Sequence, residues 1–355
     1  MGRYGFRVID ADGHGGEAKN WREKIPPEFR ETMERFRQRC AEHYGRLTLP
    51  GGGTARRGDD FEMRPGMYDP EERLRDMDLE GIDVTVTFPG GAGEEWAMLD
   101  RDFAVALCRT MNDAKAEFCR HAPDRIKAVA KLPMIDPEAA AAELRRAVTE
   151  LGLVGMVTPQ HIRDKNLDDP SFDVVWAEAE RLGAAVCVHG GGQAPDQYPI
   201  AVDRFRTRLE VHAITHPLGN MIALDCFTVG GILHRFPKLR VAFMESGCGW
   251  LPFWLERLDE HYELMPEQAP NIDRKPSEYF LDGNCFIGCD PDEQMLGYVA
   301  KVCGDHKIVY ASDYYHWDCK FPNTVKLIAE RNDLSRRSKE RILGENASVL
   351  YGIPF

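Results

Sequence analysis

The sequence is poor in the patterns that mark exported, membrane-bound or lipid-anchored proteins. No stretch approaches the roughly 18 consecutive apolar residues of a transmembrane helix. The N-terminal segment has no apolar core of the kind that a signal peptide needs, and it lacks the Ser or Thr of a myristoylation signal. We therefore expect a cytoplasmic protein that does not bind a membrane.

Paired cysteines and clustered basic residues are also missing. The ten cysteines include no Cys-x-x-Cys pair, so their spacing indicates neither a thiolate zinc site nor a disulfide framework. The formal charge is −13 at neutral pH, and the basic residues are spread along the chain. An acidic chain repels phosphate groups, which argues against nucleic acids and anionic membranes as partners. The expected partner is a small molecule.

What the sequence does contain is a regular alternation of short apolar segments with helical patterns. We predict eight strands, at residues 6–11, 82–88, 126–133, 153–158, 185–189, 239–245, 285–288 and 307–312. Each is nearly continuous in apolar residues, as expected for strands buried on both faces. Eight such units over 355 residues predict an α/β fold, a (β/α)₈ TIM barrel that forms one domain over residues 1–355.

Two segments interrupt this alternation. Residues 19–72 form a long, charged insertion after the first strand, and residues 193–220 form a long loop after the fifth, before a helix predicted at 221–236. Loops that follow barrel strands lie at the C-terminal face, where active sites of barrels are built. We expect the 19–72 insertion to cover the barrel mouth. The chain then closes with a helix at 334–350.

Polar side chains that can bind a metal follow four of the predicted strands. Asp12 and His14 come after the first strand, His189 ends the fifth, Glu245 ends the sixth and Asp313 follows the eighth. One such residue is most often an ordinary, hydrogen-bonded polar group. Four strands that deliver them to one level favour a shared cation, because burial of these groups would otherwise be costly.

These residues resemble the motifs of the amidohydrolase superfamily: Asp-x-His after strand 1, His after strand 5 and Ser-Asp-Tyr after strand 8. The segment from Gly231 to Pro252 further resembles the branch that contains aminocarboxymuconate-semialdehyde decarboxylase and the aromatic-acid decarboxylases. The resemblance covers nearly the whole chain and is weakest over residues 19–72. It implies a metal-dependent barrel enzyme, and barrels of this family often dimerise, so we expect a homo-oligomer.

The chain departs from the family pattern in its ligand types. The first motif of the family is typically His-x-His or Glu-x-His, and the sixth strand often ends in histidine. Here the candidate ligands are four carboxylates and two histidines: Asp12, Glu17, Glu245, Asp313, His14 and His189. Six ligands exceed what one cation needs, and oxygen-rich sites suit iron or manganese. The pattern resembles a small set of amidohydrolase-like proteins that bind two metals and use O₂ for hydroxylation.

Four further residues have candidate roles. His316 and His216 are candidate acid–base groups or ligands, and loop packing is the alternative for each. Arg257 resembles the family arginine that binds a substrate carboxylate, with a surface salt bridge as its alternative. Asp10 shares its side of the strand with Asp12, so a role at the site stays open.

Three functions follow from these observations. The favoured prediction is a di-iron monooxygenase with O₂ as co-substrate. The alternative is a decarboxylase or hydrolase with one manganese or zinc ion, which acts on a substrate that bears a carboxylate. A third hypothesis is a barrel that has lost catalysis and serves as a partner subunit, although the intact ligand set argues against it.

Overall fold

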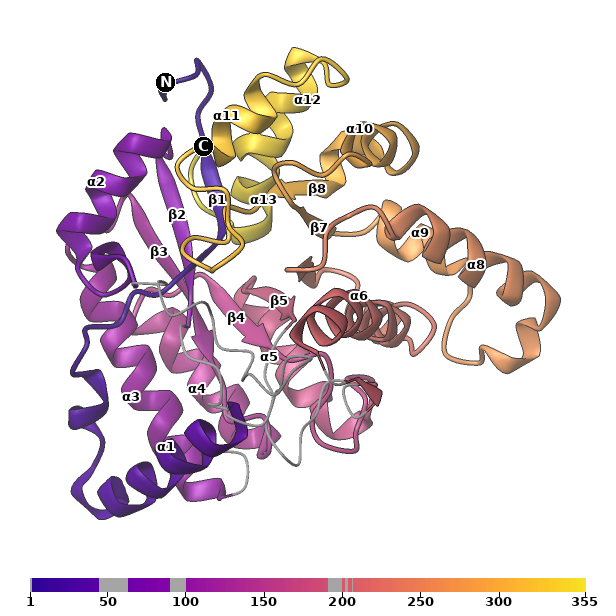
Figure 1. The fold of residues 1–355 in the computed structure, drawn as a ribbon. Helices are drawn as coiled ribbons and strands as arrows, with labels where there is room; N and C mark the ends of the chain where they lie inside the picture. The colour runs from indigo at the N-terminus through magenta and orange to yellow at the C-terminus, as the bar shows by residue number, and fades with distance from the viewer. Residues whose placement is uncertain (1, 45–62, 90–99, 191–199, 202–203, 206) are drawn as a thin grey trace.

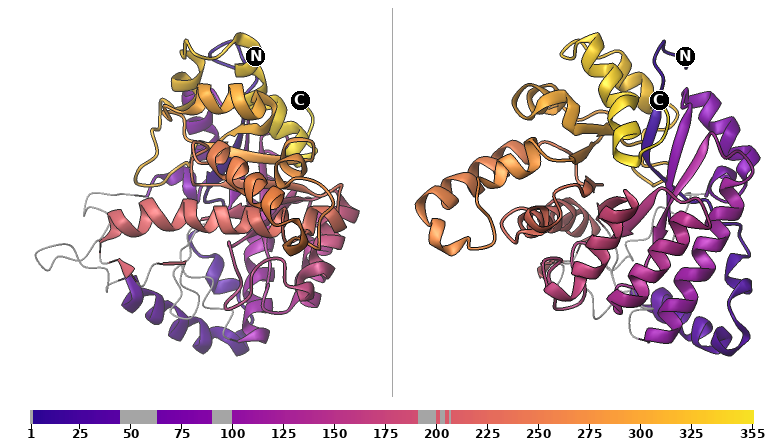
Figure 2. Two further views of the ribbon diagram at one scale, coloured as in Figure 1. Left: turned by 90° about the vertical axis from the view of Figure 1, so that its right-hand side faces the viewer. Right: turned by 180° about the vertical axis from the view of Figure 1, so that it is seen from behind.

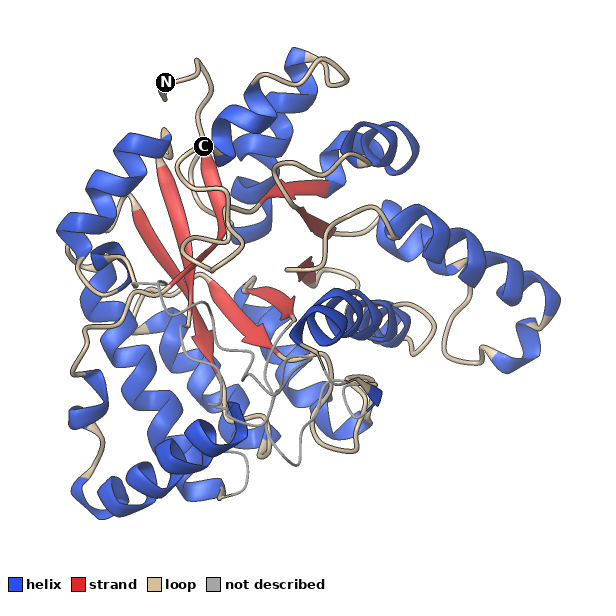
Figure 3. Ribbon diagram, viewed as in Figure 1, coloured by secondary structure: helices blue, strands red, loops and turns tan. Residues whose placement is uncertain are grey.

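The computed structural model describes residues 2–44, 63–89, 100–190, 200–201, 204–205 and 207–355. Eight parallel strands lie in the order in which they occur along the chain. Their bounds are β1 (Ile9–His14), β2 (Val84–Phe88), β3 (Ile126–Lys131), β4 (Gly155–Thr158), β5 (Ala185–His189), β6 (Arg240–Met244), β7 (Cys285–Cys289) and β8 (Ile308–Tyr310). Helices surround these strands (Figures 1 and 3). The predicted (β/α)₈ barrel is confirmed.

The barrel closes between its first strand and the segment that follows its last. The backbone N–H of Asp313 donates to the carbonyl of Asp12 at 3.0 Å, and that of His14 donates to the carbonyl of Tyr314. These bonds place the C-terminal ends of β1 and β8 side by side. Candidate ligands that follow opposite ends of the sequence therefore meet at one mouth.

Each strand is buried on both faces, as its apolar composition requires. Side chains such as Ile9, Val129 and Met244 point into the barrel and pack together there. A larger cluster lies between the strands and the outer helices, and it includes Leu144 and Trp176. Two apolar layers of this kind fix the strands, so that residues at their ends have defined positions.

Three of the outer helices begin at an Asp side chain that caps them. Asp69, Asp100 and Asp136 accept hydrogen bonds from the first turns of α2, α3 and α4. The α-helices are α1 (Arg30–Tyr44), α2 (Pro70–Glu80), α3 (Arg101–Cys119), α4 (Pro137–Thr149), α5 (Asp173–Leu182), α6 (Arg208–Phe227), α7 (Ile232–Arg235), α8 (Leu251–Leu264), α9 (Pro276–Leu281), α10 (Leu296–Val299), α11 (Thr324–Ala329), α12 (Arg336–Glu340) and α13 (Asn346–Tyr351). Viewed from behind in Figure 2, they lie outside the strands.

Short helical turns connect these elements. They are η1 (Trp21–Lys24), η2 (Pro27–Phe29), η3 (Pro65–Met67), η5 (Pro170–Phe172), η7 (Pro266–Gln268), η8 (Ala300–Gly304), η9 (Asp305–Lys307) and η10 (Arg341–Glu345). The closing helix predicted at 334–350 is therefore built from α12, η10 and α13. Among the described residues, no helix combines the length and the apolar character needed to cross a bilayer.

The insertion at 19–72 only partly lies at the barrel mouth in the described residues. Trp21, Met33 and Phe36 pack against Phe103 and other residues of α3, on the outside of the barrel. The turn at η3 does reach the mouth, because the N–H of Gly16 donates to the carbonyl of Met67 at 2.8 Å. Residues 45–62 lie outside the described part, so a cover over the mouth stays a prediction.

The predicted loop after strand 5 is in fact helical from residue 208 onward. Thr207 and Glu210 form a reciprocal capping box at the start of α6. Pro217 inside the helix is an ordinary signal for a loop, which explains why we placed the helix start too late. Because α6 begins at residue 208, His212 and His216 lie on one helix, one turn apart. Residues 191–199 of the predicted loop lie outside the described part.

Candidate metal centre

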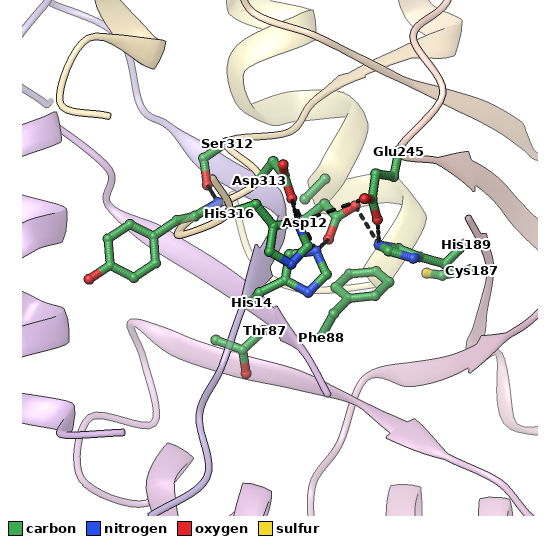
Figure 4. Close-up of polar contacts among 12 residues, drawn as sticks. Asp12, His14, Thr87, Phe88, Cys187, His189, Glu245, Ser312, Asp313 and His316 are labelled. Carbon is green, nitrogen blue, oxygen red and sulfur yellow. Dashed lines mark hydrogen bonds and ion pairs between the residues drawn. The ribbon is translucent and has the colours of Figure 1, made fainter. Parts of the chain in front are cut away.

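Six side chains converge at the C-terminal end of the barrel (Figure 4). β1 carries two of them within the strand, β5 and β6 supply one each at their ends, and the segment after β8 supplies two. They are Asp12, His14, His189, Glu245, Asp313 and His316. The structure thus brings together five of the six predicted ligands and one of the two predicted acid–base residues.

His14 is the centre of this cluster. Its Nε2 atom lies 3.2 Å from Asp313 Oδ1 and 3.5 Å from Asp12 Oδ1. His316 stacks on the His14 ring with centroids 3.8 Å apart, and its Nδ1 lies 2.6 Å from Asp313 Oδ1. The stacked ring and the carboxylate leave His14 little freedom to turn.

His189 forms the other side of the cluster. Its Nε2 atom lies 3.0 Å from Glu245 Oε2 and 3.4 Å from Asp12 Oδ2. Its Nδ1 contacts the Gly190 carbonyl at 2.6 Å, which directs Nε2 into the centre. Phe88 at the end of β2 lies 5.2 Å from this ring and 6.1 Å from that of His14, and supports both imidazoles from below.

Four buried atoms at the centre have no hydrogen bond of good geometry, although Asp313 Oδ1 lies 2.6 Å from His316 Nδ1 and His189 Nε2 lies 3.0 Å from Glu245 Oε2. They are Asp12 Oδ1, His14 Nε2, His189 Nε2 and Asp313 Oδ1. Buried polar atoms without a partner are rare because each loses its hydration. A divalent cation about 2.1 Å from each ligand separates neighbouring ligand atoms by about 3.0 to 3.4 Å. His14 Nε2 lies at such distances from Asp313 Oδ1 and Asp12 Oδ1, and the ligand atoms of Asp12, His14 and His189 lie within 4.8 Å of one another. These residues therefore fit a divalent metal ion.

Two site residues have backbone conformations that L-amino acids rarely adopt. Glu245 and Asp313 both have a φ of +51°. This left-handed region costs a residue other than glycine roughly 1 to 2 kcal/mol. Such strain is maintained where the surroundings fix it, and it is concentrated at functional sites. It turns both carboxylates inward at the ends of their strands.

The charges around the two histidines differ. Burial lowers the pKa of His14 well below its usual value, and His316 adds to this effect, so His14 is neutral and able to bind a metal. Burial also opposes protonation of His189, but Glu245 and Asp12 raise its pKa well above its usual value. Carboxylates around one imidazole attract positive charge, which a bound cation would supply.

The structure does not bring Glu17 into this cluster. Its carboxylate is buried and lies 3.4 Å from the ammonium group of Lys115, which is itself fully buried on α3. Lys115 also donates to the carbonyls of Gly15 and Phe88. Glu17 therefore compensates a buried lysine that fixes the loop after β1. Glu17 and Lys115 are far apart in the sequence, so no local sequence pattern predicts that they pair.

The other predicted residues lie at different distances from the centre. His216 on α6 lies 3.6 Å from Glu245 Oε1 through its Nε2. Arg257 is exposed on α8 and is absent from the cavity lining, so its contact with a substrate stays a prediction.

Asp10 lies beneath the ligands and is fully buried. It accepts hydrogen bonds from the N–H and hydroxyl of Ser312 and from the hydroxyl of Thr85. Arg73, also fully buried, donates to the His14 carbonyl at 2.9 Å and to Thr85. These contacts join β1, β2 and the end of β8. Asp10 therefore stabilises the strands that carry the candidate ligands.

A cavity of about 250 Å³ opens beside the cluster. Asp12, Asp313 and Glu245 face it together with His216. His212, a weaker candidate from the sequence, also lies at its wall, together with Asp290 and Asp318, which the sequence did not indicate. The helix periodicity of α6, once its start is known, places His212 beside His216. None of the described lining residues is Lys or Arg.

Comparison with known proteins identifies the relatives of this chain. Residues 9–353 match the model of the family described as amidohydrolase. A 2-amino-3-carboxymuconate-6-semialdehyde decarboxylase from Dictyostelium discoideum is 29% identical over 300 residues, which cover 82% of this chain and 79% of the relative. A gamma-resorcylate decarboxylase from Rhodococcus jostii is 26% identical over 313 residues, which cover 82% and 90%.

A solved structure shares the fold. The 5-carboxyvanillate decarboxylase from Novosphingobium aromaticivorans, in complex with manganese and 4-hydroxy-3-methoxy-5-nitrobenzoic acid, superposes with a TM-score of 0.77 at 22% identity. The match covers 99% of this chain and 98% of that one.

The prediction of a di-iron monooxygenase is wrong. The relatives are decarboxylases, and the related structure contains manganese. The prediction counted Glu17 as a sixth ligand, and Glu17 pairs with Lys115 instead. The expectation of two iron ions and of O₂ as co-substrate is therefore wrong as well.

Proposed function

The chain belongs to the amidohydrolase family, and on that basis we propose that it is a decarboxylase that needs one divalent metal ion and no O₂. Its substrate would be a small aromatic carboxylate. The observation that carries the proposal is the set of four buried, unpartnered ligand atoms beside a cavity. The curated relatives act on substrates whose names include a carboxylate, which supports the substrate class.

Four residues would bind the metal: Asp12, His14, His189 and Asp313. Two carboxylates and two imidazoles suit manganese or zinc. When bound, the cation supplies a positive charge that binds and polarises the oxygen atoms of the substrate. The stacked ring of His316 keeps Asp313 and His14 in place, which makes it a positioning residue rather than a proton donor.

Glu245 and His216 would move the proton. In decarboxylation, the bond between the ring carbon and the carboxylate breaks, CO₂ leaves, and the electron pair that stays on the carbon takes up a proton. Glu245 Oε1 and His216 Nε2 are 3.6 Å apart, and both residues face the cavity. This pair can deliver a proton to a carbon atom that lies in the cavity.

The walls of the cavity favour a small substrate. A volume of about 250 Å³ has room for one aromatic ring with its substituents. The carboxylates among the described lining residues repel an anion, and the bound cation would attract the substrate carboxylate.

The test is metal-dependent deuterium incorporation. Protein loaded with Mn²⁺ is incubated without O₂ in D₂O with gamma-resorcylate and with 5-carboxyvanillate. We expect CO₂ and a product with one deuterium at the carbon that carried the carboxylate, and no product after the metal is removed. Equal turnover by protein without metal, or no release of CO₂ from either acid, would overturn the proposal.

A further inference from the structure

Two buried amide side chains connect the helix that carries His216 to the strand end that carries Glu245. Asn220 lies on α6, one turn after His216, and none of its surface is exposed. Gln160 follows β4 and is 5% exposed. Neither contacts the four proposed ligands of the metal in the hydrogen bonds that the structure shows.

Asn220 contacts the chain on both sides of Glu245. Its Nδ2 donates to the carbonyl of Met244 at 2.8 Å and to the hydroxyl of Ser246 at 2.7 Å. Glu245 itself has the unfavourable φ of +51°. Because a strained residue relaxes when its neighbours are released, these two bonds oppose the return of Glu245 to an extended conformation.

Gln160 connects Asn220 to His216. Its Nε2 donates to the His216 carbonyl at 2.7 Å and to Asn220 Oδ1 at 3.1 Å. The packing around this link has no spare volume. A Cβ atom at Gly219 would overlap the Gln160 amide, and one at Gly190 would overlap the His216 ring.

We propose that Gln160 and Asn220 are positioning residues, which set the distance between the His216 imidazole and the Glu245 carboxylate across the cavity. The inference deepens the proposed function, because the two groups whose separation is fixed are those that would move the proton. A chain of buried hydrogen bonds is suited to this task, since each bond is short, directional and costly to break. Outer partners of this kind are typically worth about 10-fold to 100-fold in activity.

The test uses Asn220→Leu, which keeps the size of the side chain and adds no charge. It removes the amide that donates to Met244 and Ser246 and accepts from Gln160. We expect kcat for CO₂ release to fall about 10-fold to 100-fold, while KM and the affinity for Mn²⁺ change less than about 3-fold. Mn²⁺ affinity is measured separately, from the electron paramagnetic resonance signal of the free ion. Ser246→Ala, which removes one of the two bonds, should give a smaller fall in kcat in the same direction.

Asn346→Leu is the matched control. Asn346 is also buried and donates two bonds, to the carbonyls of Asp305 and Ile308, at the opposite end of the barrel. It should lose stability as Asn220→Leu does but keep kcat within about 2-fold. Equal kcat in both variants, or a fall in kcat matched by a loss of Mn²⁺ affinity, would overturn the inference. Absence of CO₂ release by the unaltered protein would instead reject the proposed function.

If Asn220→Leu does not fold, Gln160→Met and Ser246→Ala decide the question. Gln160→Met keeps the length of the side chain and removes its bonds to His216 and Asn220. A lower kcat in both variants, with Mn²⁺ affinity retained, supports the inference. An unchanged kcat in both contradicts it.

Discussion

His14 Nε2 lies 3.2 Å from Asp313 Oδ1, and neither atom forms a hydrogen bond of good geometry. The contact joins β1 to the segment after β8, so the two ends of the barrel sequence meet at this point. Replacement of Asp313 by Ala removes one of the four proposed ligands. We expect Asp313→Ala to lower Mn²⁺ affinity by more than about 10-fold, measured by titration of the protein with the ion.

Asp292→Ala is the control for this change. Asp292 is a carboxylate on the surface, paired with Lys320 at 3.3 Å, and it is absent from the cluster. Its loss should leave the affinity for Mn²⁺ unaltered. If Asp313→Ala binds Mn²⁺ as the unaltered protein does, Asp313 is not a ligand.

Replacement of Glu17 tests whether this carboxylate pairs with Lys115 or binds a metal. Glu17→Gln leaves the ammonium group of Lys115 buried beside an uncharged amide. Loss of one partner of a buried ion pair costs about 3 kcal/mol of unfolding free energy. We expect a stability loss of that order in urea unfolding, together with an unchanged number of metal ions per chain.

Glu117→Gln serves as the comparison for Glu17. Glu117 pairs with Lys24 on the surface, where both side chains are about half exposed. Exposed pairs of this kind contribute less than about 1 kcal/mol. Loss of a metal ion in Glu17→Gln would restore Glu17 as a ligand.

Asp10 is predicted to stabilise the fold rather than to bind metal. Asp10→Ala removes the acceptor of four hydrogen bonds and one of the charges that compensate the guanidinium of Arg73. We expect a loss of at least about 3 kcal/mol in urea unfolding. Ser312→Ala, which removes one of the four bonds, should lose only about 1 kcal/mol. A stable Asp10→Ala protein without metal would mean that Asp10 acts at the site.

Asp225 on α6 predicts a pH dependence of stability that is separate from the site. Burial, and then the neighbouring Asp168, raise its pKa to about 6. The folded protein therefore keeps this proton to a higher pH than the unfolded chain does. Its contribution to stability is present below about pH 4 and is lost as the pH rises through about 6.

Asp225→Asn should remove this dependence. At pH 7 the variant should be more stable than the unaltered protein, by at most about 3 kcal/mol, and the two should be equally stable at pH 4. The measurement is urea unfolding at pH 4, 5.5 and 7. A variant that is less stable than the unaltered protein at pH 7 would contradict the raised pKa.

The sequence allowed the barrel and most of the centre to be predicted, because both depend on local patterns. β5 begins and ends where we predicted, at residues 185 and 189, since its apolar run is bounded by Gly183 and Gly190. His189, Glu245 and Asp313 follow apolar strands directly, and strand ends meet in a barrel. β1 runs further than predicted, to residue 14, so Asp12 and His14 lie within the strand.

The remainder depends on contacts between distant parts of the chain. Lys115 reaches Glu17 from α3, and no periodicity indicates that pairing. Pro217 concealed the first turns of α6, and with them the pairing of His212 with His216. The predicted dimer and the domain bounds stay predictions, because the structure is of one chain and tests neither.

The most direct measurement is the amount of CO₂ released per molecule of aromatic acid consumed, by Mn²⁺-loaded protein under an atmosphere without O₂. The account predicts a ratio of one, with turnover abolished when the metal is removed. Consumption of the acid only when O₂ is present, with oxygen from O₂ in the product, would contradict it.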